Sequence, residues 1–312
     1  KKNTDKKSKA PLLIVFLGII LTAAATFGIL FFLSNKEDAD LSTPAANDYP
    51  EQIYSKLTGE VISNSLLNSS PTYCVQIPNG STDGARPQVG LTQAGIVFEA
   101  IAETGITRFA AIFQNPTSSA IGPIRSLRPY YLDWDTPFDC TVVHAGGSDE
   151  ALSAIAIGGQ RDLDENYNYM WREEDSSRLW NNLFTSPSNL TKFNTDRGYA
   201  SSNPQTFPRL TPSETQTILS DLDACLEDPT CINEATLATT VRINFSNYSV
   251  YNTIYSYNPA TNTYLRSYQT GDAHLVYECP ADLDQPQTKT DCGDLVQVNP
   301  SAIAAMLVQE NT

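Results

Sequence analysis

Residues 141–155 read TVVHAGGSDEALSAI, a pattern that predicts a buried strand followed at once by a helix. The apolar and mostly β-branched residues before His144 are typical of a strand interior. A glycine pair then allows a turn, and Ser148 can cap the next helix, with Asp149 and Glu150 in its first turn. We therefore expect strands and helices to be mixed here, with His144 at the end of a strand.

The flanking segments add further strands. Residues 94–103 and 106–114 are rich in apolar residues, and Gly105 between them predicts an antiparallel hairpin. Beyond residue 240, apolar and polar residues alternate, and residues 258–262 (NPATN) read as a turn. The sequence therefore predicts an α+β fold, with a mixed α/β first domain and a smaller, antiparallel β-rich second domain. The chain stops on apolar sequence, so we expect the second domain to be incomplete.

Composition changes along the chain predict six segments. A lysine-rich cytoplasmic tail covers residues 1–10, a transmembrane helix 11–34 and an extracytoplasmic stalk 35–71. The two predicted domains cover residues 72–205 and 235–312, and a linker with a helix (206–234) joins them.

The charge distribution argues against nucleic-acid binding. The chain has 312 residues and a formal net charge of −15, with 35 acidic and 20 basic residues. Its first ten residues carry a net charge of +4, so the remainder carries −19. Sequence-independent binding to nucleic acid needs a basic surface, which this acidic body does not offer.

The apolar run from residue 12 to residue 33 contains no charged residue and is long enough to cross a hydrocarbon core. Lysines precede the run and acidic residues follow it, which predicts that the N-terminus is inside and the main body outside. We expect a single-pass protein of the cell membrane with an extracytoplasmic body. The alternative is a cleaved signal peptide, whose apolar region is usually shorter.

Six cysteines fit an extracytoplasmic location, where disulfides persist. Short loops favour pairing Cys225 with Cys231 and Cys279 with Cys292, which leaves Cys74 with Cys140, although six cysteines allow 15 pairings. A zinc site is the rival interpretation. The sequence has no Cys-x-x-Cys motif and no nearby pair of histidines, so we expect no metal.

Charged side chains at the ends of the predicted strands form the candidate site. Three arginines, Arg108, Arg125 and Arg128, could bind an anion, because guanidinium groups bind carboxylate and phosphate in a bidentate manner. His144 could act as a general acid or base with Glu99 or Glu103. The other candidate ligand-binding residues are Arg86, Ser148 and Asn182. The sequence has no phosphate-binding glycine loop and no dinucleotide motif, so we expect no cofactor.

Each of these residues also has a structural interpretation. Glutamates and arginines at strand ends often form ordinary ion pairs, and Ser148 fits a helix cap better than a nucleophile. His144 could equally be a buried, hydrogen-bonded residue. Six tyrosines crowd residues 248–268, where they could bind sugar rings or peptides, although such tyrosines more often pack against a sheet.

Four separated blocks between residues 85 and 186 resemble a known family. They are ARPQVGLTQAGIVFEAIAETGITRFAAIFQ, IGPIRSLRPYYLDW, VVHAGGS and NNLFTS, and together they resemble the YerB-like family of bacterial surface proteins, a domain of unknown function (DUF3048). The later segment YSYNPATNTYLRSYQTGDAH resembles the C-terminal domain of that family. The resemblance implies an α+β fold and a location in the cell envelope, but no established reaction. It places the polar motif positions of the family on Arg86, Glu99, Arg108, Arg125, Arg128, His144, Ser148, Asn182 and His274.

Three functional hypotheses follow from these features. The first is a membrane-anchored binding protein for a polar, anionic component of the envelope, such as a cell-wall fragment or a surface polymer. The second is an envelope hydrolase that uses a glutamate and His144 as acid and base. The third is a protein–protein scaffold that uses the tyrosine-rich second domain.

Overall fold

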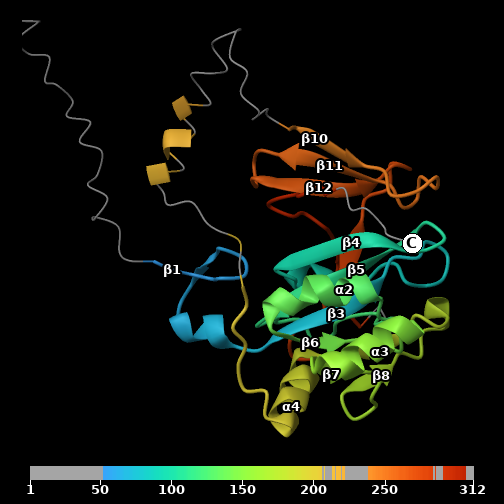
Figure 1. The fold of residues 1–312 in the computed structure, drawn as a ribbon. Helices are drawn as coiled ribbons and strands as arrows, with labels where there is room; N and C mark the ends of the chain where they lie inside the picture. Colours follow the sequence, from blue (N-terminus) through green and yellow to red (C-terminus); the bar gives the residue numbers. More distant parts are fainter. Residues whose placement is uncertain are drawn as a thin grey trace, which may run out of the picture. The chain divides into compact units, whose positions relative to one another are not determined.

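The computed structural model describes residues 52–205, 238–283 and 291–306, together with 207, 213, 214, 216–218, 220, 221 and 285. The predicted tail, transmembrane helix and Cys225–Cys231 loop lie outside these residues, as do most of the linker and part of the stalk. No helix in the described part is both long enough and apolar enough to cross a membrane. From Ile53 onward, the described residues belong to one compact unit (Figure 1).

A five-stranded sheet forms the centre of this unit. Its order is β4-β5-β3-β6-β7, in which β3, β6 and β7 are parallel and β4 and β5 are antiparallel to their neighbours. The strands are β3 (Thr72–Pro78), β4 (Ile96–Glu103), β5 (Ile106–Gln114), β6 (Cys140–Val143) and β7 (Arg161–Leu163). The β4–β5 hairpin confirms the prediction from residues 94–114. It turns at Thr104 and Gly105, which both have positive φ, as a tight two-residue hairpin turn requires.

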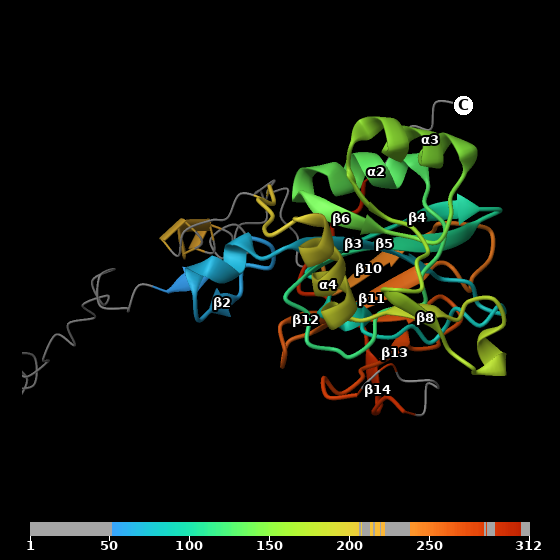
Figure 2. The same cartoon turned by 90° about the horizontal axis from the view of Figure 1, so that it is seen from below.

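Helices α2 and α3 lie together on one side of this sheet, and α4 lies on the other (Figure 2). The helices are α2 (Pro129–Asp135), α3 (Asp149–Gly158) and α4 (Pro187–Arg197), with short 3-10 helices η1 (Ser65–Ser69), η2 (Leu91–Gln93), η3 (Thr136–Phe138) and η4 (Ser176–Arg178). Alternate residues of β3 point to opposite faces: Val75 and Ile77 pack in a core with Leu190 of α4, whereas Cys74 packs in a second core with Ala151 of α3.

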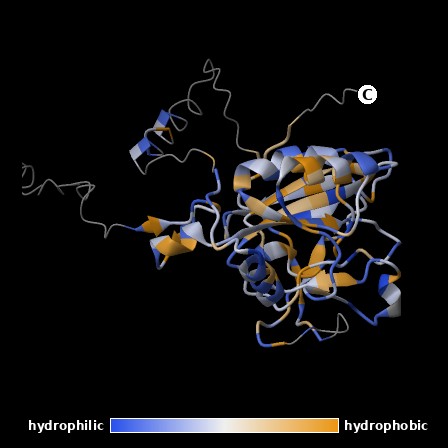
Figure 3. Cartoon of the chain, turned by 60° about the horizontal axis from the view of Figure 1, so that its bottom comes forward, coloured by the Kyte–Doolittle hydropathy of each residue, from blue (hydrophilic) through white to orange (hydrophobic). Residues whose placement is uncertain are grey.

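The later part of the chain forms small antiparallel sheets, as the alternation of polar and apolar residues predicts. One sheet has the order β10-β11-β12, and β13 pairs with β14. These strands are β10 (Thr240–Ile243), β11 (Thr253–Asn258), β12 (Thr263–Tyr268), β13 (Leu275–Tyr277) and β14 (Leu295–Gln297). Hydrophobic segments are concentrated in the strands (Figure 3). The α+β fold class is therefore confirmed.

Two further strand pairs were not predicted from the sequence. They are β1 (Ile53–Tyr54) with β2 (Val61–Ile62), and β8 (Met170–Arg172) with β9 (Leu183–Thr185). The polar and aromatic composition of residues 160–193 predicts a structured loop that leads into a helix near residues 186–192. The structure places β7, β8 and β9 in this segment, and the predicted helix is α4. Strands of two or three residues are too short to show a period of two.

Two of the three expected disulfides are present. Cys74 bonds to Cys140, which joins the neighbouring strands β3 and β6, and Cys279 bonds to Cys292. The Cys225–Cys231 pairing stays a prediction, because both residues lie outside the described part of the chain.

Candidate functional site

The candidate site lies at the carboxyl ends of the parallel strands β3 and β6. Arg125 bridges these two ends through its backbone: its N–H donates to Gln76 O (2.8 Å), and its carbonyl accepts from Ala145 N (3.1 Å). Arg108 lies opposite Pro78, the last residue of β3. β3 and β6 are neighbouring parallel strands, so their carboxyl ends meet at one edge of the sheet. In open α/β sheets, ligands commonly bind outside this edge.

Arg108 and Arg125 place two like charges near each other at this edge. Arg108 is only 7% exposed; its Nη1 donates to Ser126 O (2.7 Å) and its Nη2 lies 3.2 Å from Glu103 Oε2. Its Nε is buried and has no acceptor among the described residues. Burial lowers the pKa of Arg125, and the positive charge of Arg108 lowers it further. The guanidinium of Arg125, which is partly exposed, forms no hydrogen bond or ion pair with the residues that the structure describes.

A third arginine, Arg172 on β8, joins this cluster. It lies opposite Leu183 in the β8–β9 pair, and the carbonyl of Leu183 accepts from the N–H of Ile124, the residue before Arg125 (2.8 Å). The charge of Arg172 also lowers the pKa of Arg125, and the charge of Asp83 opposes this shift. The Nη1 of Arg172 donates to Asn182 Oδ1 (2.7 Å), and its Nη2 donates to Glu165 Oε1 (2.6 Å). Asn182 was a predicted site residue, whereas Arg172 was missed because its only sequence context is a three-residue strand.

Arg128 has a carboxylate partner of its own. Its Nη2 forms an ion pair with Glu103, and its Nη1 donates to Leu127 O (2.7 Å). The side chain of Glu103 is 43% exposed and is shared with Arg108. Glu103 therefore compensates the charge of Arg128 and part of the charge of Arg108, as the structural interpretation of strand-end residues expects.

His144 is fully buried and forms hydrogen bonds with neighbouring protein groups. Its Nδ1 lies 2.8 Å from Gly146 O, and its Nε2 lies 2.9 Å from Asp162 Oδ1. Asp164 lies 3.5 Å from Nδ1 and accepts a hydrogen bond from Gly146 N. Burial opposes the charged ring, but the bonds to Asp162 and to the Gly146 carbonyl outweigh it and raise the pKa of His144.

Ser148 caps α3, as its position in the sequence predicts. Its side chain accepts a hydrogen bond from Ala151 N (3.3 Å), and Asp149 and Glu150 occupy the first turn of the helix. Gly146, with a φ of +63°, forms the turn between β6 and the helix. The hydroxyl of Ser148 thus has a structural partner.

Arg86, Glu99 and His274 belong to a separate, buried polar network. Glu99 of β4 pairs with Arg266 of β12, with oxygen–nitrogen distances of 2.9 and 3.0 Å. Arg266 also donates to Nδ1 of His274, whose Nε2 lies 2.9 Å from Gln88 Oε1. Arg86 reaches the network through Asn79 and lies over the ring of Tyr268, 3.8 Å from its centre.

The pKa values in this network follow from burial and charge. Burial alone would lower the pKa of Arg266, but the Glu99 carboxylate outweighs it, and the pKa is raised. Burial and the charge of Arg266 both lower the pKa of His274 well below its usual range. Neutral His274 therefore accepts from Arg266 at Nδ1 and donates to Gln88 at Nε2.

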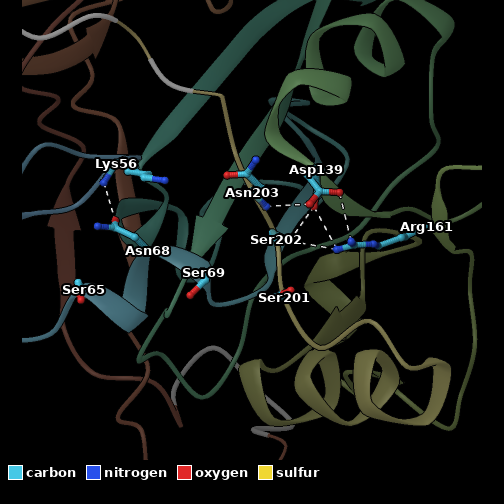
Figure 4. Close-up of a pocket in the computed structure, with 9 residues that line it drawn as sticks. All are labelled: Lys56, Ser65, Asn68, Ser69, Asp139, Arg161, Ser201, Ser202 and Asn203. Carbon is cyan, nitrogen blue, oxygen red and sulfur yellow. Dashed lines mark hydrogen bonds and ion pairs between the residues drawn. The ribbon is translucent and has the colours of Figure 1, made fainter.

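A polar hollow of about 500 Å³ lies at the opposite, amino-terminal edge of the sheet (Figure 4). Arg161 is bonded there to Asp139 and to Ser202 Oγ, so its charge already has partners. The hollow is lined by Lys56, Ser65, Asn68, Ser69, Asp139, Arg161, Ser201, Ser202 and Asn203, none of which was a predicted site residue.

The structure therefore divides the predicted residues among three places. Arg108 and Arg125 lie together, and Asn182 is linked to them through Arg172. His144 is joined to this edge through the backbone of residues 145–147. Arg86, Glu99 and His274 lie in the network around Arg266. Neither Glu99 nor Glu103 forms a hydrogen bond or ion pair with His144 within the described residues.

Comparison with known proteins gives consistent matches. Residues 57–200 match the model described as "Protein of unknown function (DUF3048) N-terminal domain". The Bacillus subtilis (strain 168) protein named "Putative lipoprotein YerB" is 32% identical over 182 residues, which cover 57% of this chain and 53% of that protein. The chain thus spans about half the length of this curated relative. The crystal structure of YerB from Bacillus subtilis matches with a TM-score of 0.55 at 26% identity, covering 70% of this chain and 67% of that one.

Proposed function

Because residues 57–200 belong to the DUF3048 family, whose function is unknown, we propose that the protein is a membrane-anchored, extracytoplasmic binding protein for an anionic component of the cell envelope. Arg125 binds the anionic group. Arg108 and Arg172, which pair with Glu103 and Glu165, add positive charge beside it, and Asn182 holds Arg172 in place. The name of the relative, a lipoprotein, supports an envelope location. The two disulfides also support an oxidising compartment.

The guanidinium of Arg125 is the observation that carries this proposal. It lies near two other arginines and forms no ion pair with a carboxylate among the described residues, although the charge of Asp83 acts on it. Clustered like charges destabilise a fold unless something compensates them, and a bound anion would do so. Arg128 and His144 already have partners in Glu103 and Asp162, so we assign them a structural role, which is to stabilise the edge of the sheet around the site.

The chemistry of the site fits phosphate or carboxylate groups. A guanidinium presents two parallel N–H groups that match two oxygens of either anion. The two other functional hypotheses receive less support. A hydrolase would need a glutamate beside His144. A tyrosine scaffold would need a continuous patch of exposed rings, whereas Tyr251, Tyr255 and Tyr268 are buried, although Tyr248 and Tyr257 are exposed.

Thermal denaturation with added anions tests the binding function. We expect inorganic phosphate to raise the melting temperature of the full chain more than chloride at equal ionic strength. Arg125→Ala should weaken the phosphate affinity about tenfold, the loss of about 1.4 kcal/mol of binding free energy.

Arg242→Ala is the matched control, because Arg242 is exposed on β10 and its loss changes the net charge equally. This variant should respond to phosphate as the parent does. Equal phosphate responses of the parent and Arg125→Ala would reject the proposed site.

A further inference from the structure

Two large aromatic side chains lie exposed on the segment that carries Arg172. Tyr167 precedes β8 and is 63% exposed, and Trp180 precedes β9 and is 57% exposed. Neither ring packs against another aromatic ring or a cation within the described part of the chain. Most aromatic rings among the described residues, by contrast, are at least partly buried or pack against other rings.

Tyr167 is exposed but held in one orientation. Its hydroxyl donates to Glu165 Oε1 (2.5 Å) and accepts from Nε of Arg172 (2.9 Å). The same guanidinium is fixed by Asn182 and Glu165. A ring that is already ordered loses little conformational entropy when a ligand packs on it, so its exposed face is a ready binding surface.

Arg172 links this ring to the arginine cluster. Its Nε is bonded to Tyr167, and its strand partner Leu183 accepts a hydrogen bond from the N–H of Ile124, the residue before Arg125. A ligand whose anionic group reaches Arg125 would therefore place its adjoining atoms near the Tyr167 ring. Those atoms would meet both an aromatic face and the polar groups of Glu165 and Asn182.

We propose that the ligand of the arginine site is an anionic saccharide, whose sugar ring packs on Tyr167 while its acidic group binds Arg125. This inference rests on the proposed function and names its ligand class. A sugar ring offers C–H groups on one face, which suit the negative face of an aromatic ring. Tyr167 and Arg172 both bond to Glu165 Oε1. The sugar hydroxyls can donate to the second carboxylate oxygen, Oε2, which accepts no hydrogen bond from the described residues.

Paired probes with and without a sugar ring test this inference. Affinities for inorganic phosphate and glucose 6-phosphate, and for acetate and glucuronate, are measured by titration calorimetry on the full chain. If the site prefers phosphate groups, we expect glucose 6-phosphate to bind about five- to tenfold more tightly than inorganic phosphate. If it prefers carboxylates, we expect glucuronate to bind more tightly than acetate by the same factor. The two pairs distinguish a phosphorylated saccharide from a carboxylated one.

Variants of Tyr167 separate the ring from its hydroxyl. Tyr167→Ala should abolish the preference for the sugar-bearing probe, while Tyr167→Phe, which keeps the ring, should retain most of it. Tyr248→Ala, which removes an exposed tyrosine from the turn between β10 and β11, should change nothing.

The outcomes distinguish this inference from the proposed function. If phosphate or acetate binds through Arg125 but the sugar adds no affinity, or Tyr167→Ala keeps the preference, the saccharide inference is overturned and the anion site stands. If the sugar-bearing probes bind equally to the parent and to Arg125→Ala, the anion site is overturned. Absence of binding to all four probes would overturn both.

Discussion

At the residue scale, the hydrogen-bond partners of His144 favour its imidazolium form and raise its pKa. A carbonyl oxygen can only accept, so Nδ1 must carry a proton to bond to Gly146 O. Nε2 faces the Asp162 carboxylate, which also accepts. Both ring nitrogens therefore donate, and the second proton is stabilised by two aspartates, Asp162 and Asp164. The ring ties the end of β7 to the turn that begins α3.

The raised pKa of His144 predicts a loss of stability at alkaline pH. The folded protein holds the His144 proton more tightly than the unfolded chain does. The contribution of His144 to the free energy of unfolding is therefore fully present below about pH 6.5, the ordinary pKa of histidine. It is lost as the pH rises through the folded-state pKa. His144→Gln should lower the free energy of unfolding by about 1.5–3 kcal/mol at pH 5.5, and by less at pH 9, in urea denaturation.

The difference between parent and variant isolates His144 from other groups. Burial raises the pKa of Glu173 to about 7, although Arg178 opposes the shift. The stability that Glu173 contributes to the folded protein is therefore also lost as the pH rises. Both proteins contain Glu173, so its effect cancels. Asp162→Asn serves as a second test, because it should also flatten the pH dependence. An unchanged difference at pH 5.5 and pH 9 would show that the ring is neutral throughout.

At the scale of elements, the two described disulfides close loops of different length. Cys74–Cys140 joins residues 66 apart in the sequence, and Cys279–Cys292 joins residues 13 apart. The first lies in the core between the sheet and helices α2 and α3, where it joins two strands whose pairing is otherwise non-local. Restricting the longer loop removes more entropy from the unfolded chain.

We therefore expect the two double-alanine variants to differ in stability. Replacing Cys74 and Cys140 should lower the free energy of unfolding by about 4 kcal/mol, and replacing Cys279 and Cys292 by about 3 kcal/mol, in the chain-entropy model. Guanidinium denaturation of the two variants and the parent measures both values. A larger loss from the Cys279–Cys292 pair would contradict the entropic explanation.

At the scale of the whole described unit, the network around Arg266 joins the five-stranded sheet to the β10-β11-β12 sheet. Glu99 and Arg266 are 167 residues apart in the sequence, and both side chains are nearly inaccessible to solvent. Asn79, Thr107 and Tyr255 supply further hydrogen bonds to this pair. A buried ion pair that loses one partner leaves an uncompensated charge.

Arg266→Met should therefore lower the free energy of unfolding by about 3–5 kcal/mol, because Glu99 stays buried without its cation. The double variant Glu99→Leu, Arg266→Met should recover much of this loss. In differential scanning calorimetry the parent should unfold in one cooperative transition, since the network couples the two sheets. Two separate transitions of the parent, or an additive double variant, would contradict this coupling.

The local features of the fold could be predicted from the sequence by itself. The β4–β5 hairpin, the strand that leads into the Ser148 cap and the Cys279–Cys292 pair all depend on residues that are near in sequence. Their propensities, turn geometry and short loop closure act before any distant contact forms. The family resemblance could also be predicted from the sequence, and the match over residues 57–200 confirms it.

Only the tertiary structure decided which charges meet. The sequence placed Glu99 and Glu103 as partners for His144, but Glu99 contacts Arg266, Glu103 contacts Arg108 and Arg128, and His144 contacts Asp162. Among the arginines of the candidate site, only the guanidinium of Arg125 forms no hydrogen bond or ion pair with the described residues, so it is available to an anion. The energy of such pairs depends on distance and burial in the folded chain, and neither quantity is encoded in the spacing of the residues along it.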